Sequence, residues 1–400
     1  MNLPIRISCL LIFFTAFYSC KKDAVVTDTV AAKKIAEHAV LKPKISSISP
    51  SQGMVFGAVR ITGTNFSPVV EGNVVRFNGF PAIVNSASKT ELIVTVPENT
   101  TTGTVSVLSN DFVDTFATPF KVLKFTPEGE MNINLNGVTE TAITKTGIVY
   151  SIRKNAQKLT AIIKSVNGTS TIVFNDAPEF EDQLNYFDHD YKGLLTDNAG
   201  NVYFASNYIR HRSVSGVATH TVLRSQIIKI SPADNATLIA GGEAGAVDGN
   251  GSNALFNNIE AMVRDAAGNL YVSDLGNSRL RKVTPAGDVT TLSTSAKIKN
   301  MAISSSGDLY FHNNLTIYKA SAATGKVSFI AGPYANGLQA MLFDAAGNLL
   351  VCNYTGILVI NRANYLSRFV PPTAINTITM DPTGKLYTFS ATKAVRYAFK

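Results

Sequence analysis

The sequence contains no tryptophan, only three cysteines and only five histidines. Charged residues make up 16% of its 400 residues and hydrophobic residues 45%, which excludes a disordered chain. Long amphipathic helical patterns are scarce, whereas Gly, Asn, Thr and Val are frequent. We therefore expect an all-β protein. Because 400 residues exceed one ordinary core, we also expect two or more domains.

The three cysteines exclude a disulfide in the folded part of the chain. Cys9 lies in an apolar N-terminal run, Cys20 follows that run, and only Cys352 remains, in the apolar stretch "LLVCNY". No His or Asp is patterned beside Cys352 as the base of a nucleophile would be, so we predict a buried core thiol.

The N-terminus has the pattern of a targeting segment. Arg6 precedes the apolar run Ile7–Phe17, which is too short to span a bilayer comfortably and is typical of a signal peptide. The following "FYSCKKD" resembles a bacterial lipobox, although Phe17 stands where Leu is usual. We predict a lipoprotein signal peptide over residues 1–19, acylation of Cys20, and a polar tether over residues 20–42. The alternative is an ordinary signal peptide cut nearby.

The net charge of +8 points to anionic partners. Acidic polysaccharide, lipid headgroups and nucleic acid all qualify, but an exported protein is not expected to meet nucleic acid. The basic residues are scattered along the chain, so part of this charge serves solvation alone.

Residues 43–123 read as a small β-sandwich, because several short strands are separated by Gly, Pro and Asn turns. The stretches "ISPSQG", "ITGTNFS", "VRFNGFPA" and "ELIVTVPENTTTGTVSV" together resemble an IPT/TIG domain. That resemblance implies an immunoglobulin-like fold and a spacer or binding module without catalysis.

Residues 124–400 repeat one pattern, a strand, a Gly turn and a second strand. The turn glycines are Gly147, Gly200, Gly268, Gly307, Gly347 and Gly384, in steps of 53, 68, 39, 40 and 37 residues. A period near 40 with several strands per unit predicts a β-propeller, here with six blades. The last repeat ends after about three strands, so we expect a strand near Phe125 or in "MNINLN" to complete it.

The stretch "YVSDLGNSRLRKV" closely resembles an NHL repeat, and its neighbours resemble it less closely. The resemblance places Asp274, Asn277 and Arg279 at the family's polar corner, where such residues mainly tie one blade to the next. The whole arrangement resembles cell-envelope lipoproteins of Bacteroidetes, which implies an anchor in the outer membrane and a periplasmic or surface location.

Ligands of propellers usually bind at the face where the inter-blade loops and the second-to-third strand corners meet. Asn suits sugar hydroxyls and Tyr offers a flat apolar face, although Asn is also common in turns for conformational reasons. The candidate ligand-binding residues at this face are Asp188, His189, Asp190, Tyr191, Asn207, Tyr208, Asn257, Asn258, His312, Asn313, Asn353 and Tyr354.

The stretch "FDHDYKG" is the densest of these candidates, and we expect it in an inter-blade loop. Asp188 and Asp190 can share one face of an extended chain, whereas His189 points the other way. These carboxylates with nearby Asn side chains permit a calcium site, His189 permits a general base, and the remaining alternative is a solvated loop. A multi-His zinc site needs the insertion that carries His211 and His220 to fold over the mouth.

We therefore predict an anchored binding lipoprotein that captures a glycan or an envelope protein at the propeller mouth. The alternative is a metal-assisted hydrolase or lyase with its site at the same mouth. No HExxH, P-loop or GxSxG motif favours that alternative, and the lack of tryptophan weakens strong sugar stacking.

Overall fold

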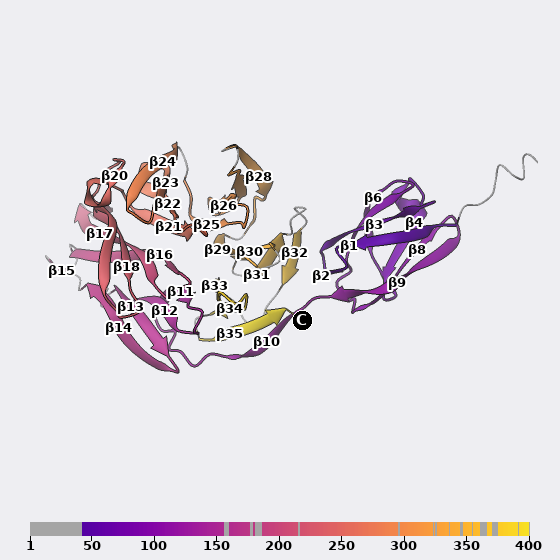
Figure 1. Cartoon of the computed structure of the whole chain (residues 1–400), viewed down its shortest axis with the longest axis horizontal. Coiled ribbons are helices and arrows are strands. Elements are labelled where there is room, and N and C mark those ends of the chain that lie inside the picture. Colours follow the sequence, from indigo (N-terminus) through magenta and orange to yellow (C-terminus); the bar gives the residue numbers. More distant parts are fainter. Residues whose placement is uncertain are drawn as a thin grey trace, which may run out of the picture.

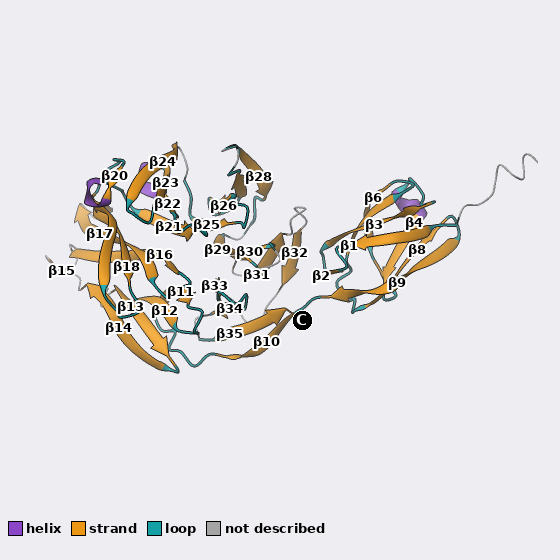
Figure 2. Cartoon of the chain, in the orientation of Figure 1, coloured by secondary structure: helices purple, strands orange, loops and turns teal. Residues whose placement is uncertain are grey.

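The computed structural model describes residues 42–400, except 156–159, 177–178, 181–185, 215–216, 295–296, 323, 325, 336, 345–346, 354, 361–365, 370–374, 391 and 400. Strands dominate the described residues (Figure 2). Their helical elements are three short 3-10 turns, η1 (Val70–Gly72), η2 (Gly251–Asn253) and η3 (Leu275–Asn277). No helix in this part of the chain is long and apolar enough to cross a membrane.

The N-terminal domain is a sandwich of two sheets. The first sheet has the order β1 (Lys44–Ser49), β3 (Ala58–Thr64), β7 (Glu91–Thr95), β6 (Ile83–Ala87). The second has the order β2 (Gln52–Gly53), β9 (Phe112–Val122), β8 (Gly103–Ser109), β4 (Asn73–Phe77), β5 (Phe80–Pro81). Alternate residues of β4 are buried, and Val75 and Phe77 join Ile61 and Leu92 in the core between the sheets. This alternation produces the expected immunoglobulin-like sandwich.

The rest of the chain forms six blades that follow one another in a ring (Figure 1). Blades 1 to 3 begin with inner strands β11 (Val138–Ile143), β16 (Tyr186–Thr196) and β21 (Ile259–Arg264), and blades 4 to 6 with β25 (Asn300–Ile303), β29 (Leu338–Phe343) and β33 (Thr377–Met380). Blade 1 continues with β12 (Val149–Lys154), β13 (Thr160–Val166) and β14 (Thr169–Asp176). Blade 2 continues with β17 (Val202–Val214), β18 (Val217–Ile230) and β19 (Ala236–Glu243), and β15 (Glu179–Phe180) pairs with β16.

Blade 3 continues with β22 (Leu270–Asp274), β23 (Arg279–Val283) and β24 (Asp288–Thr294), with β20 (Gly249–Asn250) on its outer edge. Blade 4 continues with β26 (Leu309–His312), β27 (Ile317–Ala320) and β28 (Val327–Ala331). Blade 5 continues with β30 (Leu349–Asn353), β31 (Gly356–Ile360) and β32 (Leu366–Phe369). The fold class predicted from the sequence, an immunoglobulin-like sandwich followed by a six-bladed propeller, is confirmed.

The ring closes between the two ends of the propeller. Blade 6 consists of β33, β34 (Leu386–Phe389), β35 (Ala394–Phe399) and β10 (Phe125–Glu130), which pairs antiparallel with β35. The fourth strand of the last blade therefore comes from the start of the propeller, at Phe125, which was the first of the two expected sources.

The core of the propeller is a ring of apolar clusters, each lying between two consecutive blades. Ala142 and Tyr150 of blade 1 meet Phe204 of blade 2, for example, and Leu350 of blade 5 meets Ile378 of blade 6. Corresponding clusters lie at the other four contacts between neighbouring blades. Each blade thus buries both of its faces only because it has two neighbours.

The repeated turn has a physical cause that the sequence displays as "DAAGN". Asp265 accepts hydrogen bonds from the backbone N–H of Asn269 at 2.8 Å and from its side-chain amide at 2.8 Å. Gly268 completes the turn with a φ of 91°, which a residue with a Cβ rarely adopts. The same pairing of Asp and Asn recurs in blades 2 and 5, so these turns repeat for folding.

Candidate functional site

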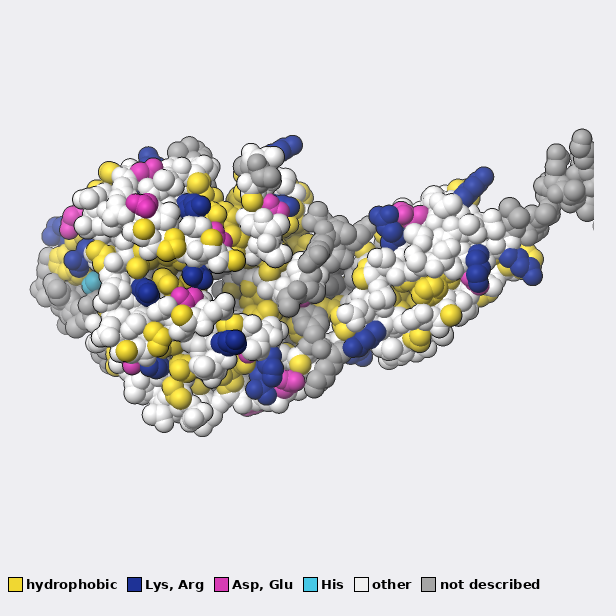
Figure 3. Space-filling view, in the orientation of Figure 1, with side chains coloured by type: hydrophobic (Ala, Val, Ile, Leu, Met, Phe, Trp, Pro, Cys, Tyr) yellow, Lys and Arg dark blue, Asp and Glu magenta, His cyan; other side chains and the backbone are white. Residues whose placement is uncertain are grey.

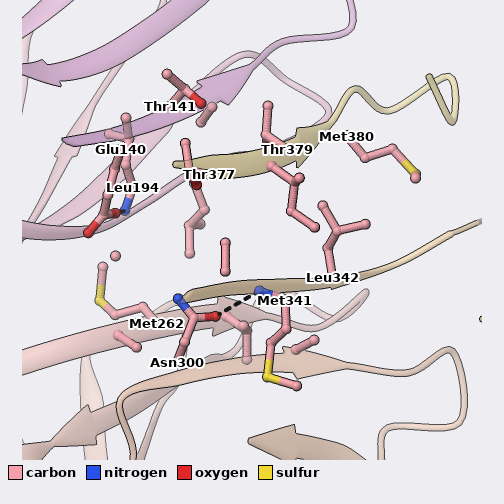
Figure 4. A pocket seen from close by; sticks show the side chains of 18 of the residues that line it. Glu140, Thr141, Leu194, Met262, Asn300, Met341, Leu342, Thr377, Thr379 and Met380 are labelled. Atoms are coloured by element: carbon pink, nitrogen blue, oxygen red, sulfur yellow. Dashed lines mark hydrogen bonds between the residues drawn. The ribbon is translucent and has the colours of Figure 1, made fainter. Parts of the chain in front are cut away.

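A central cavity of about 650 Å³, which we call the channel, is lined by the inner strands of all six blades. Figure 3 shows a hollow in the face of the propeller that is turned to the viewer, with hydrophobic side chains inside it and charged side chains near its border. The wall carries both apolar and polar side chains, among them Met262, Met341, Thr377 and Thr379 (Figure 4). The end where the inner strands begin is polar, and we call this end the mouth.

One charged or amide side chain from each blade stands at the mouth. These residues are Glu140, Lys192, Glu260, Asn300, Gln339 and Asn376, and we call them the mouth ring. All but Lys192 line the channel itself. Each precedes the turn glycine of its blade by seven or eight residues. The sequence thus contained a signal for this ring, which the search for turn and loop residues missed.

Glu140 is held in place by an irregularity in β16. The register of β16 against β17 shifts between Lys192 and Leu195, and Gly193 there has a φ of 63°. The backbone N–H of Leu194 donates to Oε2 of Glu140 at 2.9 Å, and the two residues lie together at one side of the channel (Figure 4). Burial raises the pKa of Glu140 above its ordinary value, although hydrogen bonding to Leu194 and attraction to Lys192 act in the opposite direction.

Lys192 connects the acids of the mouth. Burial lowers its pKa, but attraction to Asp190, Glu260 and Glu140 outweighs burial and raises the pKa overall. Its Nζ lies 3.6 Å from Asp190, and Nζ of Lys299 lies 3.3 Å from Oε1 of Glu260. Charges therefore alternate from Glu140 through Lys192 and Glu260 to Lys299 on blades 1 to 4. Blades 4 to 6 supply the neutral amides of the mouth ring. Such a surface can both donate to and accept from hydroxyl groups.

The stretch "FDHDYKG" lies in strand β16, and the expectation of an inter-blade loop was wrong. The long strand pairs with β17 from Tyr186 onward, which withdraws its backbone from solvent. Asp188 is 1% exposed, and its carboxylate binds Nζ of Lys154 at 2.8 Å and Nε2 of His211 at 2.7 Å. Because Asp188 and Asp190 are both paired with cations, they do not form the open oxygen cage that calcium requires.

The aromatic candidates on this strand have different environments. Tyr191 is 1% exposed and packs against Phe174 and Phe204, so its ring belongs to the core. Tyr208 is half-buried and stacks on Phe187, with Arg224 over its ring. His189 bonds to Ser206 through Nδ1 at 2.9 Å. A ligand could reach only the partly exposed members of this group.

Asn207 and Asn258 take part in bonds that tie blade 2 to blade 3, and Asn257 bonds to blade 3 alone. Asn207 is fully buried, donates to the carbonyl of Ile259 at 2.8 Å and accepts from its N–H at 3.0 Å. The backbone N–H of Asn258 donates to Oγ of Ser225, and that of Asn257 donates to Asp274. The side chain of Asn207 is therefore committed to the fold, and this placement corrects its expected role as a ligand contact.

The candidates on blades 4 and 5 also serve local structure. His312 is 1% exposed, donates from Nε2 to the carbonyl of Gln339 and accepts at Nδ1 from the N–H of Asn314. Burial lowers its pKa, so it is neutral and has no free nitrogen for a metal or a proton. Asn313 and Asn353 each accept from the N–H of a residue two or three positions later, as turn residues do. Tyr354 lies outside the described residues.

The polar corner of blade 3 holds the loop that enters the blade. Asn277 donates to the carbonyl of Gly245, and Arg279 to that of Ala246. Asp274, which is fully buried, accepts from Asn277 and from Arg281. Arg281 is also fully buried, and the sequence analysis did not single it out.

Two other sequence predictions concern cysteines and metals. Cys352 is free and buried, and burial raises its pKa to about 12, which excludes a reactive thiolate at neutral pH. Among the described residues, no group of three or more His, Cys, Asp or Glu side chains is arranged to hold a metal ion. Cys20 lies outside the described residues, so its acylation stays a prediction.

Comparison with known proteins identifies the N-terminal domain. Residues 43–122 match the IPT/TIG domain, so this part of the chain belongs to that class of immunoglobulin-like modules. No curated protein matches the sequence of the chain.

Several solved structures are similar to the chain at low sequence identity. A protein of unknown function from Bacteroides thetaiotaomicron is 13% identical, with a TM-score of 0.46 over 90% of this chain and 99% of that one. An auxiliary nutrient binding protein from Bacteroides ovatus is 12% identical, with a TM-score of 0.45 over 90% and 98%. Virginiamycin B lyase from Staphylococcus aureus is 14% identical, with a TM-score of 0.42 over 69% and 88%.

Proposed function

We propose that the protein is an exported, lipid-anchored binding protein that holds a glycan at the mouth of its propeller. The observation that carries this proposal is the mouth ring, in which all six blades supply a charged or amide side chain at the same level. Amides and carboxylates are the groups that bind sugar hydroxyls, because together they offer both donors and acceptors.

The walls beside the mouth add a second element of the proposed site. The first half of β16 contains the partly exposed Phe187, whose ring stacks on that of Tyr208 in β17 with centroids 5.7 Å apart. Aromatic faces next to hydrogen-bonding groups suit a ring that is apolar on one face and polar at its edge. An exposed segment of an envelope protein is the other ligand that such a mouth would accept.

The location in the proposal depends on Cys20. An acylated Cys20 and a polar tether would hold the sandwich and the propeller away from a bilayer. Mass spectrometry of the mature N-terminus tests this directly. A diacyl or triacyl Cys20 supports the anchor, and an unmodified terminus at another residue contradicts it.

The binding experiment uses a polysaccharide array and a matched pair of variants. Asn300→Ala with Gln339→Ala removes two amides of the mouth ring, whereas Asn313→Ala removes an exposed turn amide on the same blade as Asn300. We expect one glycan class to bind the wild type and the Asn313 variant, and to bind the double variant at least about 10-fold more weakly, as the loss of two hydrogen bonds implies. Equal binding by the three proteins would refute the site, and no binding to any glycan would favour a protein ligand.

A further inference from the structure

Two histidines face each other across the long β17–β18 hairpin of blade 2. Neither belongs to the mouth ring. His211 on β17 is the direct cross-strand partner of His220 on β18. Their Nδ1 atoms lie 2.7 Å apart, and their rings are inclined by 73°. His220 is exposed, and His211 is 15% exposed. Two imidazole nitrogens therefore converge on one point that solvent can reach.

The opposite side of His211 is fixed by buried groups. Its Nε2 bonds to Oδ1 of Asp188 at 2.7 Å, and the other oxygen of Asp188 bonds to Nζ of Lys154 at 2.8 Å. Tyr186 stacks on the imidazole with a centroid distance of 4.2 Å and an angle of 9°. An ionised carboxylate requires the proton of neutral His211 to be on Nε2, so Nδ1 presents its lone pair to His220.

This arrangement is the one by which proteins orient a metal-binding histidine. A ligand histidine almost always donates its second ring N–H to a carboxylate, a carbonyl or water, which sets the tautomer and increases the basicity of the coordinating nitrogen. Asp188 fills that role for His211 from a buried position. The stacked Tyr186 keeps the ring in the same plane.

We propose that Nδ1 of His211 and Nδ1 of His220 bind one divalent transition-metal ion, with Asp188 as the supporting carboxylate. Imidazole favours zinc, copper and nickel over calcium or magnesium. Two nitrogens at about 2.0 to 2.1 Å from a tetrahedral ion are about 3.3 Å apart. From the present 2.7 Å, the two nitrogens have to separate by about 0.6 Å, a displacement that the exposed side chain of His220 permits while His211 stays in place.

The change that the metal demands is small in chemical terms. Without metal, the 2.7 Å contact is a hydrogen bond in which neutral His220 donates from Nδ1 to Nδ1 of His211. With metal, His220 carries its proton on Nε2 and coordinates through Nδ1, so both ligands remain neutral and no net proton is released. The remaining coordination positions are filled by water or by an oxygen of a bound ligand.

The test uses the purified full-length protein without a polyhistidine tag. Zinc binding is measured by titration calorimetry, and copper(II) binding by electron paramagnetic resonance, which counts the coordinated nitrogens. The informative variant is His220→Ala, because His220 is exposed and its loss does not disturb the core. His189→Ala is the matched control, since this histidine lies on the adjacent strand β16 of the same blade and bonds to Ser206 instead.

We expect one zinc ion per chain, two coordinated histidine nitrogens for copper, and at least about a tenfold loss of zinc affinity in His220→Ala but not in His189→Ala. Asp188→Asn should weaken zinc binding about 10- to 100-fold while leaving both nitrogens in the copper spectrum. Circular dichroism confirms that each variant is folded. Absence of zinc binding in the wild type, or equal binding in wild type and His220→Ala, would overturn the proposal and leave the pair as a hydrogen bond within the hairpin.

Discussion

Replacing Arg281 by Met should destabilise the propeller strongly, because this side chain is the centre of a buried ionic network. Arg281 is fully buried and donates to Asp274 at 2.9 Å, to Asp248 at 2.6 Å and to the carbonyls of Leu255 and Val247. The variant leaves the buried Asp274 carboxylate without its cation. Removal of one partner from a buried pair costs about 3 to 5 kcal/mol. For a domain of this size, that loss lowers Tm by about 6 to 20 °C.

The assay is thermal and urea unfolding of four proteins that form a double-mutant cycle. Asp274→Asn in the Arg281→Met background removes the stranded charge, so it should be less damaging there than in the wild type. Arg279→Met is the control on the same strand, because Arg279 makes one exposed hydrogen bond and its loss should cost about 1 kcal/mol. A loss below about 1 kcal/mol for Arg281→Met, or additive effects in the cycle, would refute the reasoning.

Three further outcomes follow from the geometry. Gly193→Ala should destabilise the fold by about 1 to 2 kcal/mol, measured by urea unfolding, because φ is 63° and a Cβ would lie 2.9 Å from the N of Met262; no loss would contradict this. Burial alone would raise the pKa of Asp265, but the hydrogen bonds from Asn269 outweigh burial and lower the pKa overall, so the ionised carboxylate stabilises the fold above about pH 4 and this stabilisation is lost on acidification. Tm of Asp265→Asn should therefore fall less between pH 5 and pH 2 than Tm of the wild type. Parallel curves of Tm against pH would refute this prediction. Cys352, with its pKa raised to about 12, should react with a thiol reagent at pH 8 only after urea is added, and rapid reaction of the folded protein would count against its burial.

The sequence was sufficient to predict the architecture because local chemistry repeats. The Asp–Gly–Asn turn signal recurs in several blades, since each such turn needs the same hydrogen bonds and the same positive φ. The IPT/TIG segments likewise span almost the whole sandwich. Even the closing strand at Phe125 could be anticipated, because the last repeat lacked one strand.

The site was harder to predict because it depends on register and burial. His211 lies opposite His220 because both belong to the extended β17–β18 hairpin, whereas the sequence analysis treated this stretch as an insertion and not as two paired strands. Asn207 and His312 have the composition of ligand contacts, but their polar atoms are used by neighbouring blades. Polarity in a sequence does not say whether a partner is already inside the protein.

The mouth ring shows the opposite case, a signal that was present but not used. Its members share a position seven or eight residues before the turn glycine, but they differ in type, from Glu140 to Lys192 to Asn300. A search for one repeated residue passes over a position whose shared property is polarity. An alignment of the six blades by position would have found the ring.

The closing strand β10 has a mechanical consequence. It follows β9 of the sandwich after only Leu123 and Lys124, and it pairs antiparallel with the C-terminal strand β35. Tension between the sandwich and the propeller therefore pulls β10 lengthwise along β35. Such shear stretches all the hydrogen bonds of this pair at once, whereas a pull at a right angle would break them one after another. The joint that completes the ring is thus also the joint that carries a force applied between the two domains.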